Sequence, residues 1–139
     1  MYYFSKNSKA KIAELHPLLQ RILYRAIEDS PFDFGVHQGH RSIEDQKKAY
    51  DKGLSKIDGI HRRGYHNYKP ALAFDYHVAG PDIWDKEKLK AVADHIKKIG
   101  KEEFNVELTW GGEWKHLHDW DHIQLPYQFR KEAEEKKLY

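Results

Sequence analysis

The sequence predicts an α+β fold in which a short antiparallel sheet and flanking helices form one domain of 139 residues. Three features lead to this prediction. Two segments carry apolar residues at the three- and four-residue spacing of an amphipathic helix. Several shorter apolar runs lie between glycines and prolines, as strands do. The helical and strand patterns do not alternate regularly, which favours α+β over a β-α-β arrangement.

The first helical pattern starts at Ser8 and predicts a helix that faces the core. Its apolar positions are Ile12, Leu15, Leu18, Leu19, Ile22, Leu23, Ala26 and Ile27. We expect Pro17 near the first turn of the main helix, where a missing amide hydrogen costs nothing. Ser30-Pro31 ends this pattern, and residues 32–40 then predict a short strand that stops at Gly39.

The next segment predicts a helix followed by a long loop. Ser42 is a suitable N-cap for a helix through Lys52, and Gly53 is a suitable residue to close it. Residues 54–65 show no periodicity and are expected to be irregular.

A buried strand and a second strong helix follow. The apolar run Ala71 to Val78 lies between Pro70 and Gly80 and predicts a strand that carries Asp75. Asp85 is expected to begin a helix that Gly100 ends. The face of this helix toward the core would hold Leu89, Val92, Ala93, Ile96 and Ile99.

The last part of the chain predicts two strands and a terminal helix. Phe104 to Trp110 is expected to be a strand, with a turn at Gly111-Gly112. His122 to Leu125 predicts another short strand, and residues 128–138 a charged helix.

Composition excludes several kinds of protein. The absence of cysteine rules out thiolate ligands, disulfides and cysteine nucleophiles, so any metal must be held by histidine and carboxylate groups. Twenty-four basic residues nearly balance 22 acidic ones, and no basic block indicates a nucleic-acid partner. The N-terminus lacks the apolar core of a signal peptide, and no stretch approaches the roughly 20 apolar residues of a membrane span. We therefore expect synthesis in the cytoplasm without membrane insertion.

Four residues form a candidate zinc site. His66 and Asp75 are nine positions apart, and Asp119 and His122 follow much later. Two imidazoles and one carboxylate can hold zinc and leave one position open for water, while a spare carboxylate such as Asp119 could act as a base. Spacing alone leaves another reading open, in which these residues are a surface histidine, turn and loop acids and a lone histidine.

A series of motifs surrounds these residues between roughly residues 8 and 125. In chain order, the motifs are Leu15-His16-Pro17-Leu18-Leu19-Gln20, Gly39-His40-Arg41-Ser42, Gln46, Tyr50, Gly53, Ser55-Lys56, His66 through Asp75, Gly111-Gly112-Glu113-Trp114 and Asp119-Trp120-Asp121-His122. In these motifs and their order, the sequence resembles the zinc-dependent peptidoglycan peptidases. This family comprises the L-alanyl-D-glutamate endopeptidases of phage endolysins and the D-alanyl-D-alanine carboxypeptidases.

The resemblance implies the small fold shared by hedgehog signalling domains and D,D-peptidases. It implies one zinc ion held by His66, Asp75 and His122, with Asp119 as the catalytic base. Arg41 matches the family arginine that faces the substrate carbonyl or carboxylate, where a guanidinium could stabilise an oxyanion. Gln46 is expected to pack against or support the site, as is Tyr50, rather than to react.

The resemblance also implies a function, which is hydrolysis of the L-alanyl-D-glutamate bond in peptidoglycan stem peptides by a phage or prophage endolysin. Residues 1–139 would form a single, monomeric catalytic domain without a cell-wall-binding domain, and residues 125–139 a C-terminal helix or tail. The enzyme would be made in the host cytoplasm without a signal peptide and act on the wall after release. Two alternatives stay open: a D-alanyl-D-alanine carboxypeptidase, and an inactive zinc-binding or peptidoglycan-binding module.

The sequence departs from the family at two positions. Gly64 stands where the family often has serine, so a hydrogen bond that orients the first histidine is either missing or supplied from elsewhere. Asp121 stands where proline commonly precedes the last histidine. On an extended segment its side chain would point away from that of His122, which favours Asp119 as the base. His116 and His118 match no ligand position and are expected to line the cleft or face solvent. The same is expected of His37, His40, His61, His77 and His95.

Overall fold

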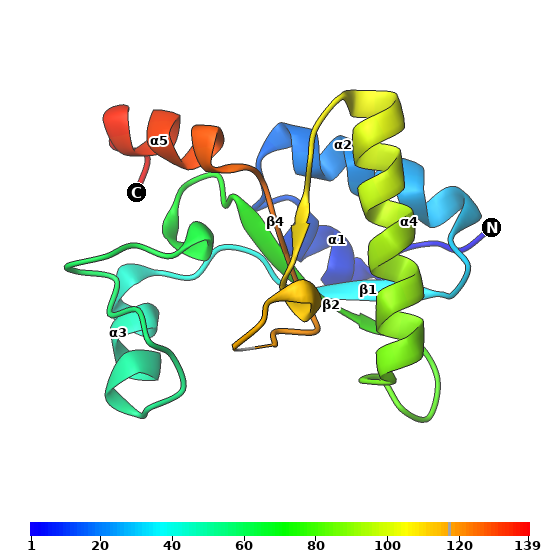
Figure 1. Ribbon diagram of the computed structural model, residues 1–139, viewed down its shortest axis with the longest axis horizontal. Helices are drawn as coiled ribbons and strands as arrows, with labels where there is room; N and C mark the ends of the chain where they lie inside the picture. The colour runs from blue at the N-terminus through cyan, green and yellow to red at the C-terminus, as the bar shows by residue number, and fades with distance from the viewer. Residues whose placement is uncertain (117) are drawn as a thin grey trace.

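A four-stranded antiparallel sheet forms the centre of the computed structural model, which describes residues 1–116 and 118–139 (Figure 1). The strand order is β1-β2-β4-β3. The strands are β1 (Phe34–Gln38), β2 (Ala73–Val78), β3 (Thr109–Trp110) and β4 (His122–Gln124). The predicted α+β class and antiparallel sheet are therefore confirmed.

Five α-helices in the described residues surround this sheet. They are α1 (Lys6–Ile12), α2 (Pro17–Ala26), α3 (Ile43–Asp51), α4 (Lys86–Phe104) and α5 (Tyr127–Glu135). Figure 1 shows α4 on one side of the strands and α3, with the loop that follows it, on the other. No helix in the described part of the chain has the length and apolar character needed to cross a membrane.

Alternate side chains of strand β2 point toward the hydrophobic core and toward the candidate site. Phe74, Tyr76 and Val78 are buried in the hydrophobic core. The Tyr76 hydroxyl donates to the carbonyl oxygen of Leu89 at 2.6 Å, which joins β2 to α4. Successive strand side chains point to opposite faces, so Asp75 lies on the face away from this core.

Helix α3 begins as the sequence predicts. The Ser42 hydroxyl accepts a hydrogen bond from the amide of Asp45, and Gly53 follows the helix with a φ of 75°. This left-handed backbone conformation favours glycine, which explains why the helix stops there. The following loop is irregular, as expected, and leads to the short 3-10 helix η2 (Tyr65–Asn67).

The first predicted helix is divided into α1 and α2. Pro17 is the first residue of α2, and the His16 imidazole caps that helix by accepting from the amide of Leu18. Residues before a proline disfavour helical backbone, and the chain between the helices instead pairs with Ala71 through Glu14 and His16. This pairing fixes the segment that leads into β2.

The predicted end of α4 is wrong, and so is the predicted start of β3. Helix α4 continues past Gly100 to Phe104 and ends at Asn105, whose φ is 54°. Gly100 is explained by close packing, because a Cβ there would lie 3.1 Å from Cδ1 of Leu108. The expected strand from Phe104 is reduced to Thr109 and Trp110, which pair with β4.

Candidate metal centre and active site

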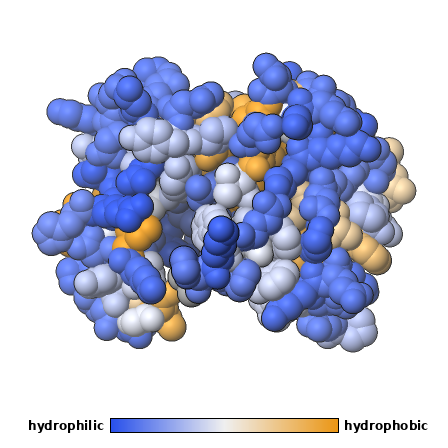
Figure 2. Space-filling model, viewed as in Figure 1, coloured by the Kyte–Doolittle hydropathy of each residue, from blue (hydrophilic) through white to orange (hydrophobic). Residues whose placement is uncertain are grey.

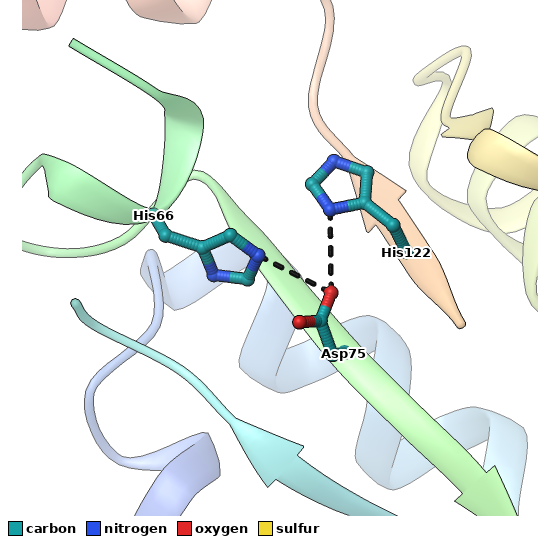
Figure 3. Close-up of side chains that lie close together, drawn as sticks. All are labelled: His66, Asp75 and His122. Atoms are coloured by element: carbon teal, nitrogen blue, oxygen red, sulfur yellow. Dashed lines mark hydrogen bonds and ion pairs between the residues drawn. The ribbon is translucent and has the colours of Figure 1, made fainter. Parts of the chain in front are cut away.

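Three predicted residues converge on one point (Figure 3). Oδ1 of Asp75 lies 3.2 Å from Nε2 of His66 and 3.3 Å from Nδ1 of His122. The exposed fractions of their side chains are only 14%, 9% and 9%, respectively. Each residue offers one ligand atom, and these atoms all lie within 4.8 Å of one another. The group could therefore hold a metal ion.

The sheet register brings two of these residues together. Asp75 on β2 and His122 on β4 are directly opposite partners in the antiparallel pairing. Side chains of opposite partners lie on the same face, which makes their contact a consequence of register. His66 comes from η2, where its backbone carbonyl accepts from the amide of Arg41 at 2.8 Å.

Hydrogen bonds on the far side of each imidazole orient both rings. Nδ1 of His66 donates to the carbonyl oxygen of Gly39 at 2.7 Å, because a carbonyl can only accept. Nε2 of His122 lies 2.8 Å from Oε1 of Gln124. The remaining nitrogen of each ring faces Asp75, as a metal ligand requires. The Gly39 carbonyl thus orients His66, although Gly64 has no side chain that could do so.

The ligand set matches the chemistry of zinc. It consists of two imidazole nitrogens and one carboxylate oxygen, with no sulfur. Burial favours a raised pKa for Asp75, but hydrogen bonds from His122 and His66 hold that pKa well below its usual range. Asp75 is consequently ionised at neutral pH, as a ligating carboxylate must be.

Asp119 lies beside this group without belonging to it. Its Oδ2 is 3.9 Å from Nδ1 of His122, and 45% of its side chain is exposed. The amide of Asp119 donates to the carbonyl of Gly111 at 3.0 Å, and a Cβ on Gly111 would collide with the Asp119 backbone. A glycine at position 111 is thus required for the approach that positions Asp119.

Asp121 does not point away from the site, contrary to the expectation from sequence. Its carboxylate accepts a hydrogen bond from the protonated carboxyl group of Asp119 and lies 3.3 Å from Nε2 of His37. The expectation fails because Trp120 and Asp121 form a turn, in which the amide of His122 donates to the Asp119 carbonyl at 3.2 Å. Partial burial and the hydrogen bond with Asp121 raise the pKa of Asp119 to about 7.

Arg41 faces the same cavity as the three candidate ligands and Asp119. Its Nη1 donates to Oε1 of Gln46 at 3.1 Å. Gln46 is 3% exposed, and its amide nitrogen donates to the Ser55 hydroxyl and the Ile57 carbonyl. The predicted supporting role of Gln46 is confirmed, whereas Tyr50 is 46% exposed.

The cavity around these residues has a volume of about 370 Å³. Figure 2 shows a hollow between the side of α3 and the centre of the molecule, on a surface that is mainly hydrophilic. Lys56 from the loop after α3 and Trp114 also line the cavity. The ring of Trp114 is 5.3 Å from that of His122. The cleft therefore combines cationic and aromatic walls around the candidate ligands.

The remaining predicted bystanders lie outside the His66–Asp75–His122 group. His116 is exposed, and His118 stacks on Trp120 while its Nδ1 lies 3.0 Å from the Gly112 carbonyl. His37 is exposed and contacts Asp121. Together with Asp75, these two residues form a second, more open group whose ligand atoms also lie within 4.8 Å of one another.

Sequence reasoning missed the supporting roles of Gly39 and Gln124. Gln124 is detectable in principle, because it lies two residues after His122 in one strand and hence on the same face. The contact of Gly39 joins residues 27 positions apart and leaves no local signal.

The fold and this cleft define a candidate active site that could hold a metal ion, and comparison with known proteins identifies the family. A family model of phage L-alanyl-D-glutamate peptidases matches residues 1–127. The L-alanyl-D-glutamate peptidase of Escherichia phage T5 is 30% identical over 120 residues, which are 86% of each chain. The crystal structure of the Serratia marcescens L-Ala D-Glu endopeptidase ChiX superposes with a TM-score of 0.79 at 25% identity. That match covers 92% of this chain and 93% of the other.

This chain belongs to the phage L-alanyl-D-glutamate peptidase family. The family predicted from the sequence motifs is confirmed.

Proposed function

We propose that this protein is a zinc peptidase that hydrolyses the bond between L-alanine and D-glutamate in peptidoglycan stem peptides. One observation carries the proposal: the buried His66–Asp75–His122 group opens into a cleft beside Asp119, in a member of the L-alanyl-D-glutamate peptidase family. The endopeptidase names of its relatives favour this bond over the terminal D-alanyl-D-alanine bond.

His66, Asp75 and His122 are the proposed zinc ligands. Their two oriented imidazoles and ionised carboxylate support this choice. Zinc bound there would supply a Lewis acid that polarises the scissile carbonyl and makes water a stronger nucleophile at neutral pH. Because the site is buried, water competes less with the metal for these ligand atoms. Gly39 and Gln124 hold the two imidazole rings in place.

Asp119 is the proposed general base. It takes a proton from the attacking water and passes it to the leaving amine of D-glutamate. Its place at the edge of the ligand group, 3.9 Å from His122, supports this role. Its exposure to the cleft also matters, because a base must reach water and substrate. A cation in the site would favour the ionised form of Asp119 that this step needs.

Arg41 is proposed to stabilise the oxyanion that forms on the attacked carbonyl. The guanidinium lines the cleft and is held by Gln46, so it is positioned before substrate binds. A donor fixed in advance avoids a reorganisation cost when charge develops in the transition state.

Residues 1–139 are proposed to act as one monomeric catalytic unit. Among the described residues, one cluster of buried side chains runs from Phe4 to Ala133, which supports a single domain. By analogy with the phage T5 relative, we propose that the enzyme acts on the bacterial wall after release from the cell that makes it.

Metal removal and restoration test the proposal. Purified peptidoglycan is incubated with protein that has been stripped by a chelator, and new amino groups are quantified before and after metal is added back. We expect no release from stripped protein and recovery with one equivalent of zinc but not with magnesium. Full activity in the stripped protein would refute the zinc assignment, and wall binding without release would indicate an inactive module.

A further inference from the structure

A second pocket lies next to the candidate active site. It has a volume of about 270 Å³ and is lined by Trp84, Lys86, Leu89, Trp120 and Asp121. Trp84 is 48% exposed, although tryptophan is costly to leave in water. Two indole rings with one cation and one carboxylate make a mainly apolar pocket that has polar groups to orient a ligand.

The walls of this pocket are held in place before any ligand arrives. The amide of Trp84 donates to Oδ1 of Asp82 at 3.0 Å, and the Val78 amide donates to the Ile83 carbonyl at 3.1 Å. These bonds fix the loop between β2 and α4. The Trp120 carbonyl accepts from the indole nitrogen of Trp110 at 2.8 Å. A fixed pocket loses little conformational entropy on binding.

Trp84 and Trp120 differ in how much of their surface is free. Trp120 packs against His118, with ring centroids 5.5 Å apart, and Nζ of Lys86 lies 5.0 Å from its ring centre. Trp120 therefore serves mainly as a wall. Trp84 makes an edge contact with the ring of His37, and about half of its surface remains open to a ligand.

Asp121 connects this pocket with the catalytic cleft. It lines the pocket and hydrogen-bonds Asp119, which lines the cleft. Arg41 and Lys56 line the same cleft from the α3 side. Figure 1 shows α3 and the start of α4 on opposite sides of the strands. A substrate that crosses the candidate metal centre thus meets cations toward α3 and indole rings toward α4.

The two ends of this path match the two sides of the proposed scissile bond. On one side, D-glutamate carries a free carboxylate, which suits Arg41 and Lys56. On the other side, L-alanine is joined directly to the lactyl group of an N-acetylated sugar. Because one residue spans only about 3.5 Å, that sugar must lie close to the bond that is cut.

Resting on the proposed function, we propose that the Trp84–Trp120 pocket binds the N-acetylmuramic acid ring that carries the stem peptide. The apolar face of the pyranose ring packs on Trp84, as apolar groups pack on aromatic faces. Lys86 and Asp121 supply a donor and an acceptor for its hydroxyl and acetamido groups. The enzyme then recognises the glycan and the peptide together.

Two matched substrates test this subsite. One is the disaccharide tetrapeptide released from peptidoglycan, and the other is the same tetrapeptide with an N-acetyl group in place of the sugars. We expect Trp84→Ala to lower kcat/KM about tenfold on the sugar-bearing substrate, as expected for loss of one aromatic contact, and to leave the sugar-free substrate unchanged. Trp84→Phe should keep part of the difference. Tyr127→Ala, which removes another exposed aromatic ring outside the pocket, should change neither value.

Other outcomes would overturn the subsite. An equal loss on both substrates would mean that Trp84 supports the catalytic residues, and no loss on either would mean that it contacts no sugar. Cleavage of the sugar-free peptide by the wild type reports on the proposed function separately. As an independent readout, N-acetylmuramyl-L-alanine should change the tryptophan fluorescence of the wild type but not of Trp84→Ala, and N-acetyl-L-alanine should change neither. Identical responses of the two proteins would contradict the proposal.

Discussion

His66 and Gly39 are joined by a 2.7 Å hydrogen bond from the imidazole Nδ1 to the backbone carbonyl oxygen, across 27 positions of sequence. This bond keeps a proton on Nδ1 of His66, because a carbonyl can only accept, and it leaves Nε2 as the ring nitrogen that could bind a metal. Nε2 is the atom that faces Asp75. Gly39, which directly follows β1, therefore orients a candidate ligand that lies on η2.

Gly39→Ala should weaken zinc binding through this contact. A Cβ at position 39 would lie 2.7 Å from the Lys11 carbonyl and 2.8 Å from Oε1 of Glu14, so the end of β1 must move. Loss of such an outer hydrogen bond typically costs about 10–100-fold in metal affinity. A competition titration against a chromophoric chelator measures the change.

The matched control for this variant is Gly64→Ala. Its added Cβ would meet its nearest neighbour, Oδ1 of Asn67, at 3.4 Å, an ordinary contact. Its zinc affinity should stay close to that of the wild type. Equal affinities for the Gly39 and Gly64 variants would argue against the orienting role of the Gly39 carbonyl.

Asp119→Ala and His66→Ala should separate the base from the ligands. The Asp119 variant should retain one zinc per chain and lose turnover by about 10²–10⁴-fold, the usual contribution of a general base. The His66 variant should lose both zinc and turnover. Elemental analysis of the purified proteins and rates on peptidoglycan give the two readouts, and substantial turnover in Asp119→Ala would rule out its assignment as the base.

Gln46→Leu should destabilise the fold and impair the cleft. The change removes the amide that bonds Arg41, Ser55 and the Ile57 carbonyl in a side chain that is 3% exposed. Leaving buried polar partners unpaired costs about 1–3 kcal/mol of unfolding free energy. Urea denaturation monitored by fluorescence measures this loss of unfolding free energy.

Lys48→Ala on the same helix provides the control for that measurement. The Lys48 side chain is 62% exposed, so its loss should change stability by no more than about 0.5 kcal/mol. If the Gln46 and Lys48 variants unfold at the same urea concentration, the supporting role of Gln46 is wrong.

Zinc should also stabilise the native chain. The three candidate ligands come from η2, β2 and β4, and unfolding separates them. A ligand at 100 times its dissociation constant adds about 2.7 kcal/mol to the free energy of unfolding. Thermal unfolding should therefore occur at a higher temperature with zinc than with excess chelator. His122→Ala should abolish the difference, and an unchanged wild-type transition would count against binding at this group.

Local patterns predicted much of the fold because they act over one or two turns of chain. The Ser42 cap, the core face of α4 and the apolar run that forms β2 were all predicted from neighbouring residues. The predicted helix end at Gly100 was wrong because a glycine is needed there for close packing against Leu108, which is a tertiary contact. Local glycine rules cannot distinguish a helix end from a close approach.

The same distinction between local patterns and tertiary contacts applies to the candidate site. Its ligands were predicted from family motifs, whereas their convergence depends on the pairing of Asp75 with His122 across two strands. The position of Asp121 was mispredicted because this residue lies in a turn before β4 and not on an extended segment, so the alternation of strand side chains does not apply to it.

Mass spectrometry of the fragments that the zinc-loaded protein releases from purified peptidoglycan tests the central claim most directly. The account predicts peptides with a new N-terminal D-glutamate, glycan strands whose lactyl groups carry only L-alanine, and neither product after chelator treatment. Release of free D-alanine with intact L-alanyl-D-glutamate bonds would contradict it.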